Sequence, residues 1–197
     1  THQPIEHLQS LRAMPNLLVM RPADAVETAE CWETALRQSD RPTVLALSRQ
    51  GLPQVRTEAA DGNLSARGAY RLKAASGTRK VILIATGSET HVALECAEQL
   101  EQQGIGADVV SMVCTELFDE QDEAYKVDLL PNVNPDEILR VSIEAGTTFG
   151  WERYTMANGL NIGIDRFGAS APAEDLFEKF DITADAIVPQ IMNKLNA

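Results

Sequence analysis

Two stretches of this sequence carry side chains that could bind a small polar substrate and act on it. His2 lies near Pro4 and outside any apolar period, and near neutral pH a histidine can exchange a proton or bond a hydroxyl. Arg49, within Ser48-Arg49-Gln50-Gly51, directly follows an apolar run, and α/β proteins place ligand groups at the carboxyl ends of parallel strands. A guanidinium there suits a two-pronged grip on phosphate or carboxylate. The alternatives are an exposed histidine near a chain end and a surface arginine paired with a glutamate.

Two other turns carry polar side chains for which a structural role is a simpler explanation than ligand binding. Thr86-Gly87-Ser88 offers backbone N–H groups to an anion but lacks the glycine spacing of a nucleotide-binding loop, so helix capping by Ser88 is the simpler interpretation. Asp165-Arg166-Phe167-Gly168 is expected to be a turn with a local ion pair. No Ser/His/Asp set, paired-carboxylate site or metal-ligand cluster stands out, so the sequence assigns no cofactor-binding or metal-binding residue.

The elements that would position these side chains fall into two segments. In residues 1–53 the sequence predicts two strands, at 17–20 and 44–47, on either side of a helix that Asp24 caps with Glu27 three residues on. Four apolar residues at helical spacing are expected to form its buried face: Ala25, Ala29, Trp32 and Leu36. Three elements cannot close a sheet, so this strand–helix–strand unit is predicted to be an incomplete part of something larger.

Residues 69–197 alternate strands and helices more fully. Strands are predicted at 81–85, 108–112, 138–143 and 162–164, with helices from Ser88 to Gly104, at 120–130, at 151–158 and after Thr183. This rhythm predicts an α/β fold, a three-layer sandwich around a mostly parallel sheet. Residues 54–68 are polar and without a period, and are predicted to form an interdomain linker.

Composition limits the class of partner. The 197-residue chain has a formal net charge of −12, with most of the excess acid in residues 61–197. A surface this acidic repels polyphosphates and anionic lipids, which argues against nucleic acid and membranes as partners. The three cysteines are widely spaced and form no CxxC pair, which is typical of a reduced, cytoplasmic protein. A local cation would have to hold any small anionic substrate, which draws attention to the arginines of residues 1–53.

Six stretches together resemble transketolase. They are THQPIE at 1–6, RAMPN at 12–16, RPAD at 21–24, LSRQ at 47–50, ATGSE at 85–89 and GIDRFGAS at 163–170. They span nearly the whole chain in family order, and the first and fourth discriminate against other thiamine-diphosphate enzymes.

The resemblance implies an activity and two site residues. The family transfers a two-carbon ketol unit from a ketose phosphate, such as xylulose 5-phosphate, to an aldose phosphate, such as ribose 5-phosphate, in the pentose phosphate pathway. It is a homodimer that uses thiamine diphosphate with Mg²⁺ or Ca²⁺. His2 matches the catalytic histidine that reaches the first hydroxyls of the substrate, and Arg49 matches the arginine that binds the sugar phosphate.

The same resemblance implies that most of the catalytic groups precede Thr1. Residues 1–53 match the tail of the pyrimidine-binding domain and residues 69–197 match the C-terminal domain, joined by the linker at 54–68. We therefore expect a fragment that is inactive alone, binds no cofactor and exposes apolar surface in residues 1–53. The alternatives are a fragment of dihydroxyacetone synthase, or a stand-alone, non-enzymatic α/β module that binds an anion or a partner.

Overall fold

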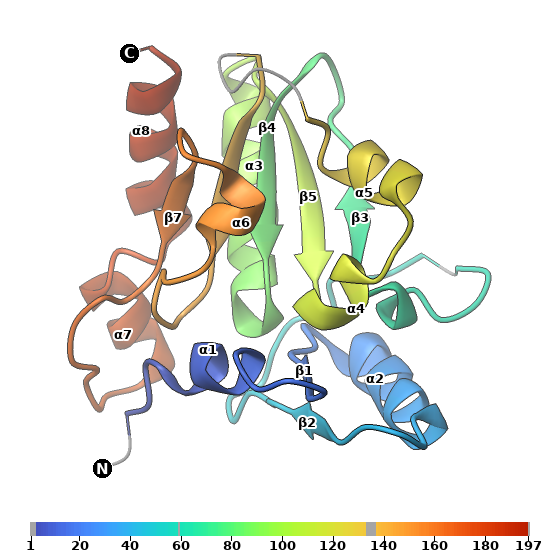
Figure 1. Ribbon diagram of the computed structural model, residues 1–197. Helices are drawn as coiled ribbons and strands as arrows, with labels where there is room; N and C mark the ends of the chain where they lie inside the picture. The colour runs from blue at the N-terminus through green and yellow to red at the C-terminus, as the bar shows by residue number, and fades with distance from the viewer. Residues whose placement is uncertain (1–2, 59, 133–136, 197) are drawn as a thin grey trace.

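The computed structural model describes residues 3–58, 60–132 and 137–196, whose strands form two sheets (Figure 1). In the smaller sheet, β1 (Leu18–Met20) pairs in parallel with β2 (Thr43–Leu45). The larger sheet has the strand order β3-β5-β4-β6-β7, in which β3 runs antiparallel to β5 and the other described pairs are parallel. Its strands are β3 (Ala69–Lys73), β4 (Arg79–Ala85), β5 (Gly106–Met112), β6 (Leu139–Ile143) and β7 (Leu160–Ile162). The predicted α/β class with a mostly parallel sheet is confirmed.

Helices cover both faces of the larger sheet, which makes it the middle layer of a three-layer sandwich. On one face lie α3 (Thr90–Gln102), α7 (Ala173–Lys179) and α8 (Ala184–Leu195); on the other lie α4 (Thr115–Asp119), α5 (Glu123–Leu129) and α6 (Glu152–Thr155). Within β4, Val81, Leu83 and Ala85 join the first core, whereas Ile82 and Ile84 join the second. A strand buried on both faces needs such a continuous apolar run, because its side chains alternate between the two layers.

Residues 3–53 form a smaller unit beneath the carboxyl ends of β4 and β5 (Figure 1). This unit contains α1 (His7–Arg12), β1, α2 (Ala25–Arg37) and β2. β1 is fully buried, and its Leu18 and Met20 share a core with Tyr70 of β3. The backbone just after β1 is bonded to the backbone just after β5 of the larger sheet, because the N–H of Arg21 donates to the carbonyl of Val113 at 2.8 Å. The two sheets are therefore joined through packed side chains and through main-chain hydrogen bonds.

The predicted buried face of α2 is wrong, although its predicted N-cap is confirmed. The Asp24 carboxylate accepts a hydrogen bond from the N–H of Glu27 at 2.9 Å. Trp32 is 51% exposed and Leu36 is 79% exposed. The other two residues of the predicted face, Ala25 and Ala29, are exposed as well, and the helix buries Glu27, Cys31 and Thr34 instead.

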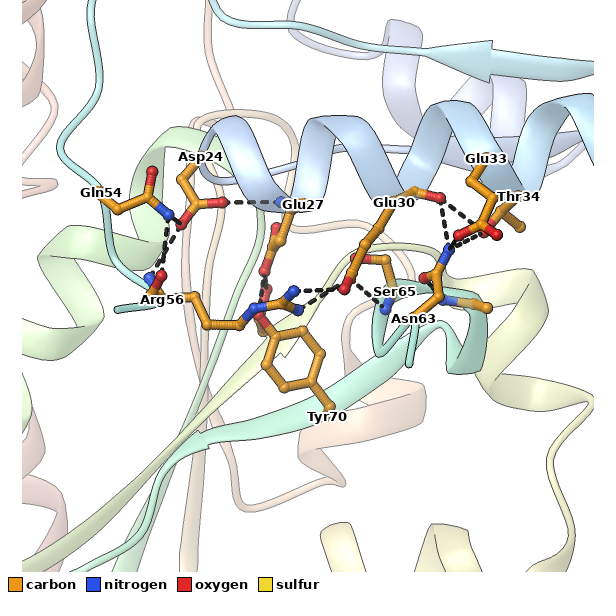
Figure 2. Close-up of polar contacts among 12 residues, drawn as sticks. Asp24, Glu27, Glu30, Glu33, Thr34, Gln54, Arg56, Asn63, Ser65 and Tyr70 are labelled. Atoms are coloured by element: carbon orange, nitrogen blue, oxygen red, sulfur yellow. Dashed lines mark hydrogen bonds and ion pairs between the residues drawn. The ribbon is translucent and has the colours of Figure 1, made fainter. Parts of the chain in front are cut away.

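Polar contacts explain why the polar side of α2 faces inward (Figure 2). Glu27 accepts hydrogen bonds from the hydroxyls of Tyr70, at 2.7 Å, and Ser111, at 2.6 Å. One turn on, Glu30 forms a partly buried ion pair with Arg56, from the stretch predicted to be a linker. Residues 54–56 and 63–65 are thus fastened along α2 and its N-cap by hydrogen bonds. The apolar side of the helix is left facing outward.

Helix ends differ from the sequence prediction in two places. The helix expected at 120–130 is divided, since α4 ends at Asp119 and α5 begins after Asp122, whose carboxylate accepts from the N–H of Tyr125 at 2.8 Å. The helix expected at 151–158 is the single turn α6, which stops because Met156 adopts a left-handed φ of 65°. In the part of the chain that the structure describes, no helix has the length and apolarity needed to cross a bilayer.

Candidate functional site

The two stretches that the sequence singled out converge on one cavity. His2 itself lies outside the described residues, but residues 3–5, which follow it, line a cavity of about 240 Å³. Gln50 lines the same cavity, and Arg49 lies next to it in an exposed bend after β2. Arg49 forms no ion pair with a carboxylate of the described residues, so the alternative of a glutamate-paired surface arginine finds no support there.

The larger-sheet half of the molecule forms the back of this cavity. Phe177 and Phe180 supply an apolar wall, and Ser88 and Glu89 supply a polar edge. Gly168 allows the N-terminal stretch to approach closely, since a Cβ atom at this position would lie 2.7 Å from the Cβ of Gln3. The cavity therefore combines a rim from residues 3–53 with a wall from the three-layer sandwich.

The N-terminal stretch is held in place by the loop that follows β6. Ile5 is only 8% exposed and packs into the core formed by β4, β6, α3 and α8. Its carbonyl oxygen accepts a hydrogen bond from the N–H of Thr147 at 3.2 Å. A Cβ atom at Gly146 would lie 3.3 Å from the same carbonyl oxygen. The sequence immediately after His2 is thus anchored by both side-chain burial and the main chain.

Glu144, the first residue after β6, is the centre of a buried ion cluster. Its carboxylate accepts two hydrogen bonds of 2.8 Å from the guanidinium of Arg12, one of 2.8 Å from the hydroxyl of Thr86 and one of 3.0 Å from the indole of Trp151. The Glu144 side chain is 1% exposed. Burial alone would raise the pKa of Glu144, but the charges of Arg12 and Arg21 lower that pKa to about 2. The carboxylate therefore stays ionised at neutral pH.

Arg21 enters the same cluster from the end of β1. Its guanidinium binds the Glu89 carboxylate, donates to the hydroxyl of Thr86 at 2.6 Å and lies 3.6 Å from Glu144. The hydroxyl of Ser88 donates to Glu89 at 2.5 Å and makes no capping bond to α3, so the predicted Ser88 cap is wrong. A buried carboxylate requires donors, and here it takes the hydroxyl that the helix end would otherwise use.

This cluster fills the crevice in which a sheet of this kind usually binds a ligand. β4 and β6 are neighbours, and the chain leaves β4 for α3 on one face and leaves β6 for α6 on the other. Such a switch point opens a crevice at the carboxyl ends of the two strands. The side chains of Arg12 and Arg21 occupy it, and the N–H of Gly87 donates to the carbonyl of Arg21 at 3.0 Å. In the turn at 86–88, a backbone N–H that could have bound an anion is therefore already bonded to the carbonyl of Arg21.

The charged turn near position 165 also differs from its prediction. Asp165 accepts hydrogen bonds from the hydroxyls of Thr147, at 3.0 Å, and Thr148, at 2.6 Å. Arg166 donates to the carbonyl of Lys179 and its guanidinium lies 5.0 Å from the ring centre of Phe180. The two charges serve different loops, so the expected local ion pair is wrong.

Metal-ligand clusters of three or more residues and reactive thiols are both absent from the described residues. Within residues 3–58, 60–132 and 137–196, no three or more His, Cys, Asp or Glu side chains lie together in a way that could hold a metal ion. The thiols of Cys31 and Cys96 are buried, and burial raises the pKa of each to about 12. Such thiols stay protonated and are poor nucleophiles.

The ion cluster is the feature that sequence reasoning missed. Its members lie up to 132 positions apart, so no local spacing reveals it. The available signal was the position of Glu89 and Glu144 just after two buried strands, where an acidic side chain needs a cation.

Comparisons with known proteins match both halves of the chain. Residues 1–54 match the family described as "Transketolase, pyrimidine binding domain", and residues 68–183 match "Transketolase-like TK C-terminal domain". A transketolase from Sinorhizobium medicae is 50% identical over 99% of this chain and 28% of its own length. A chloroplastic transketolase from Solanum tuberosum is 50% identical over 95% of this chain and 25% of its own length. The chain thus spans about a quarter of the length of these curated relatives.

Solved structures give the same result. A transketolase from Pichia stipitis in complex with sedoheptulose 7-phosphate superimposes with a TM-score of 0.89 and 36% identity, covering 99% of this chain and 27% of that one. A split-gene transketolase, described as an inactive β4 tetramer, has a TM-score of 0.80 and 26% identity, covering 99% of this chain and 63% of that one.

Proposed function

This chain belongs to the transketolase family, and from that membership we propose that it forms part of an enzyme that transfers a two-carbon ketol unit from a ketose phosphate to an aldose phosphate. The observation that supports the proposal most directly is the convergence of residues 3–5 and Gln50 on one cavity. Those residues adjoin His2 and Arg49, the two positions that match substrate-binding residues of the family.

We assign the two rim residues different roles. Arg49 binds the phosphate of the sugar, which suits its exposed position at a strand end and the fork geometry of a guanidinium. His2 bonds the first hydroxyls of the substrate and exchanges a proton there near neutral pH. The acidic chain as a whole repels an anionic sugar phosphate, so the local cation of Arg49 is needed to hold it.

The cofactor proposed for the complete enzyme is thiamine diphosphate with Mg²⁺ or Ca²⁺. When bound, it supplies the carbanion chemistry that cleaves a ketose. Because this chain spans only about a quarter of the length of its relatives, we propose that other parts of a homodimeric transketolase hold this group. Within that enzyme, residues 1–53 would complete the pyrimidine-binding domain, 54–68 would connect it, and 69–197 would be the C-terminal domain of a cytoplasmic protein of the pentose phosphate pathway.

We propose further that the 197-residue chain has no activity alone. The split-gene neighbour, described as inactive, is consistent with this proposal. No observation favours the alternatives of a dihydroxyacetone synthase fragment or a non-enzymatic module.

The test compares the chain with a complete enzyme that contains it. Each is incubated with thiamine diphosphate, magnesium, xylulose 5-phosphate and ribose 5-phosphate, and we expect turnover only from the complete enzyme. In that enzyme, Arg49→Gln should lower kcat/KM for xylulose 5-phosphate roughly 10- to 100-fold, the loss expected when a charged hydrogen bond is removed, and should leave unphosphorylated xylulose unaffected. Turnover by the isolated chain, or an equal loss with both ketoses, would contradict the proposal.

A further inference from the structure

We propose that Glu144 is a positioning residue that sets the spacing between the two rim stretches of the substrate site, residues 3–5 and 48–50. This inference rests on the proposed function, because it concerns how His2 and Arg49 are held relative to one another. Glu144 is not among the residues that line the cavity, so it acts through the arginines that it binds.

The first connection runs from Glu144 to the stretch after His2. Arg12 ends α1, which begins two residues after Ile5, and its guanidinium forms two parallel hydrogen bonds of 2.8 Å with the Glu144 carboxylate. The same loop holds Ile5 through the N–H of Thr147 at 3.2 Å. The loop after β6 therefore holds both ends of the segment from Ile5 to Arg12, through Thr147 at one end and Glu144 at the other.

The second connection runs from Glu144 to the stretch around Arg49. Arg21 follows β1 directly and lies 3.6 Å from the Glu144 carboxylate. β1 pairs with β2, and the carbonyl of Met20 accepts a hydrogen bond from the N–H of Ala46 at 2.8 Å. Only two residues separate Ala46 from Arg49. A shift of Arg21 would therefore move β2 and the short stretch after it that carries Arg49.

Glu144 is suited to this role because it is reached from both sides and cannot easily move. Its side chain is 1% exposed, and each carboxylate oxygen accepts a second hydrogen bond besides that from Arg12, one from Thr86 and the other from Trp151. Arg21 is fixed in turn by Glu89 and by main-chain bonds to Val113 and Gly87. The crevice at the carboxyl ends of β4 and β6 would then bind Arg12 and Arg21, and in this way hold residues 3–5 and 48–50 at a fixed spacing.

A spacing role and a purely structural role make different predictions for substrates with and without phosphate. A phosphorylated ketose must reach His2 and Arg49 at the same time, whereas an unphosphorylated ketose needs only the histidine end. A change in the spacing between residues 3–5 and 48–50 therefore lowers kcat/KM for the phosphorylated ketose more than for the unphosphorylated one. A loss of folded enzyme lowers the activity toward both ketoses by the same factor.

The experiment measures kcat/KM of the complete enzyme with xylulose 5-phosphate and with xylulose, using ribose 5-phosphate as acceptor. For Glu144→Gln we expect the ratio between the two ketoses to fall roughly tenfold or more, since misplacement by about 1 Å can cost up to 100-fold in rate. Arg12→Lys keeps the charge but not the paired bonds, and should lower the ratio in the same direction by a smaller factor. This second variant keeps the test decisive if Glu144→Gln does not fold.

Glu120→Gln is the matched control. Glu120 also pairs with an arginine of the first segment, Arg41, at 2.5 and 2.9 Å, but its side chain is 53% exposed and does not line the cavity. The ratio should be unchanged in this variant. An unchanged ratio in both Arg12→Lys and Glu144→Gln would overturn the inference, whereas a wild-type enzyme without ketol transfer would overturn the proposed function itself.

Discussion

At the residue scale, two buried carboxylates at the junction of the two sheets, Glu144 and Glu27, are stabilised in opposite ways. Glu144 is surrounded by guanidinium groups, which keep it ionised despite its burial. Glu27 receives only hydroxyl and backbone donors, and burial raises its pKa although those hydrogen bonds oppose the rise. Both side chains join residues 3–53 to the three-layer sandwich, but only Glu144 does so through ion pairs.

The depressed pKa of Glu144 predicts how stability should depend on acidity. The pKa is lowered from 4.5 to about 2, so the ionised group stabilises the fold above about pH 4.5 and this contribution is lost as the pH falls toward 2. We expect Glu144→Gln to lower the free energy of unfolding by about 3 kcal/mol near neutral pH, because buried arginines lose their partner. The difference from the wild type should shrink as the pH falls. Urea denaturation of the chain between about pH 7 and pH 3 measures it.

The exposed pair between Arg41 and Glu120 is the control for this measurement. Glu120→Gln should change the free energy of unfolding by less than about 1 kcal/mol, because solvent screens the pair. A Glu144→Gln difference that stays constant between about pH 5 and pH 3 would contradict the assigned pKa.

At the element scale, strands could be predicted from sequence more reliably than the orientation of α2. Residues 81–85 of β4 are an unbroken apolar run because they are buried on both faces of the sheet, and this pattern is local. The apolar spacing of α2 predicted a helical stripe correctly, but not what would lie against it. In the described residues that stripe is exposed, and the helix packs through Glu27 and Glu30, whose partners lie up to 84 residues away.

The same limit applies to the candidate site. His2 and Arg49 could be selected from residue type and position, and the cavity lined by residues 3–5 and Gln50 supports selecting these two stretches together. The ion cluster could not be found in this way, because Arg12 and Glu144 meet only after both segments have folded. Which hydroxyl caps a helix and which serves a carboxylate, as at Ser88, is likewise decided by distant groups.

Gly68, between the 54–68 stretch and β3, provides an element-scale prediction. It has a φ of 81°, and a Cβ atom would lie 2.1 Å from the backbone nitrogen of Phe118 and 2.5 Å from the carbonyl oxygen of Cys114. We expect Gly68→Ala to lower the free energy of unfolding by about 2–5 kcal/mol, the sum of left-handed strain and overpacking. Chemical denaturation of the chain checks this value.

Gly62 separates those two contributions. Its φ of 90° is similar, but apart from its chain neighbours no atom of the described residues lies within 4 Å of the place that a Cβ would take, so Gly62→Ala is expected to carry backbone strain alone. Its cost should be about 1–2 kcal/mol. Equal losses in the two variants would show that the close approach of β3 to α4 does not contribute.

At the scale of the whole molecule, an apolar strip along α2 is left uncovered by the described residues. Val26, Trp32 and Leu36 are 37%, 51% and 79% exposed, whereas the other tryptophan, Trp151, is 2% exposed. The smaller sheet beside them has only two described strands, too few for independent stability in water. We propose that, in the complete enzyme, the rest of the pyrimidine-binding domain covers this strip.

Substitution of Leu36 tests this proposal, because the two forms of the protein should respond differently. In the isolated chain, Leu36→Asp changes an exposed position and should alter the free energy of unfolding by no more than about 0.5 kcal/mol. In the complete enzyme the new carboxylate would be buried without a partner, and the loss should reach about 2–4 kcal/mol. Urea denaturation of both forms, followed by circular dichroism, gives the two values.

Arg37→Ser is the matched control, since it changes the next residue of α2 on its solvated side. The Arg37 side chain is 76% exposed and pairs with Glu33 one turn earlier, an interaction worth less than about 0.5 kcal/mol. It should be tolerated in both forms. If Leu36→Asp is tolerated equally well in the complete enzyme, then the strip stays open to solvent there, and the smaller sheet must gain its stability from the sandwich alone, through β1 and the ion cluster.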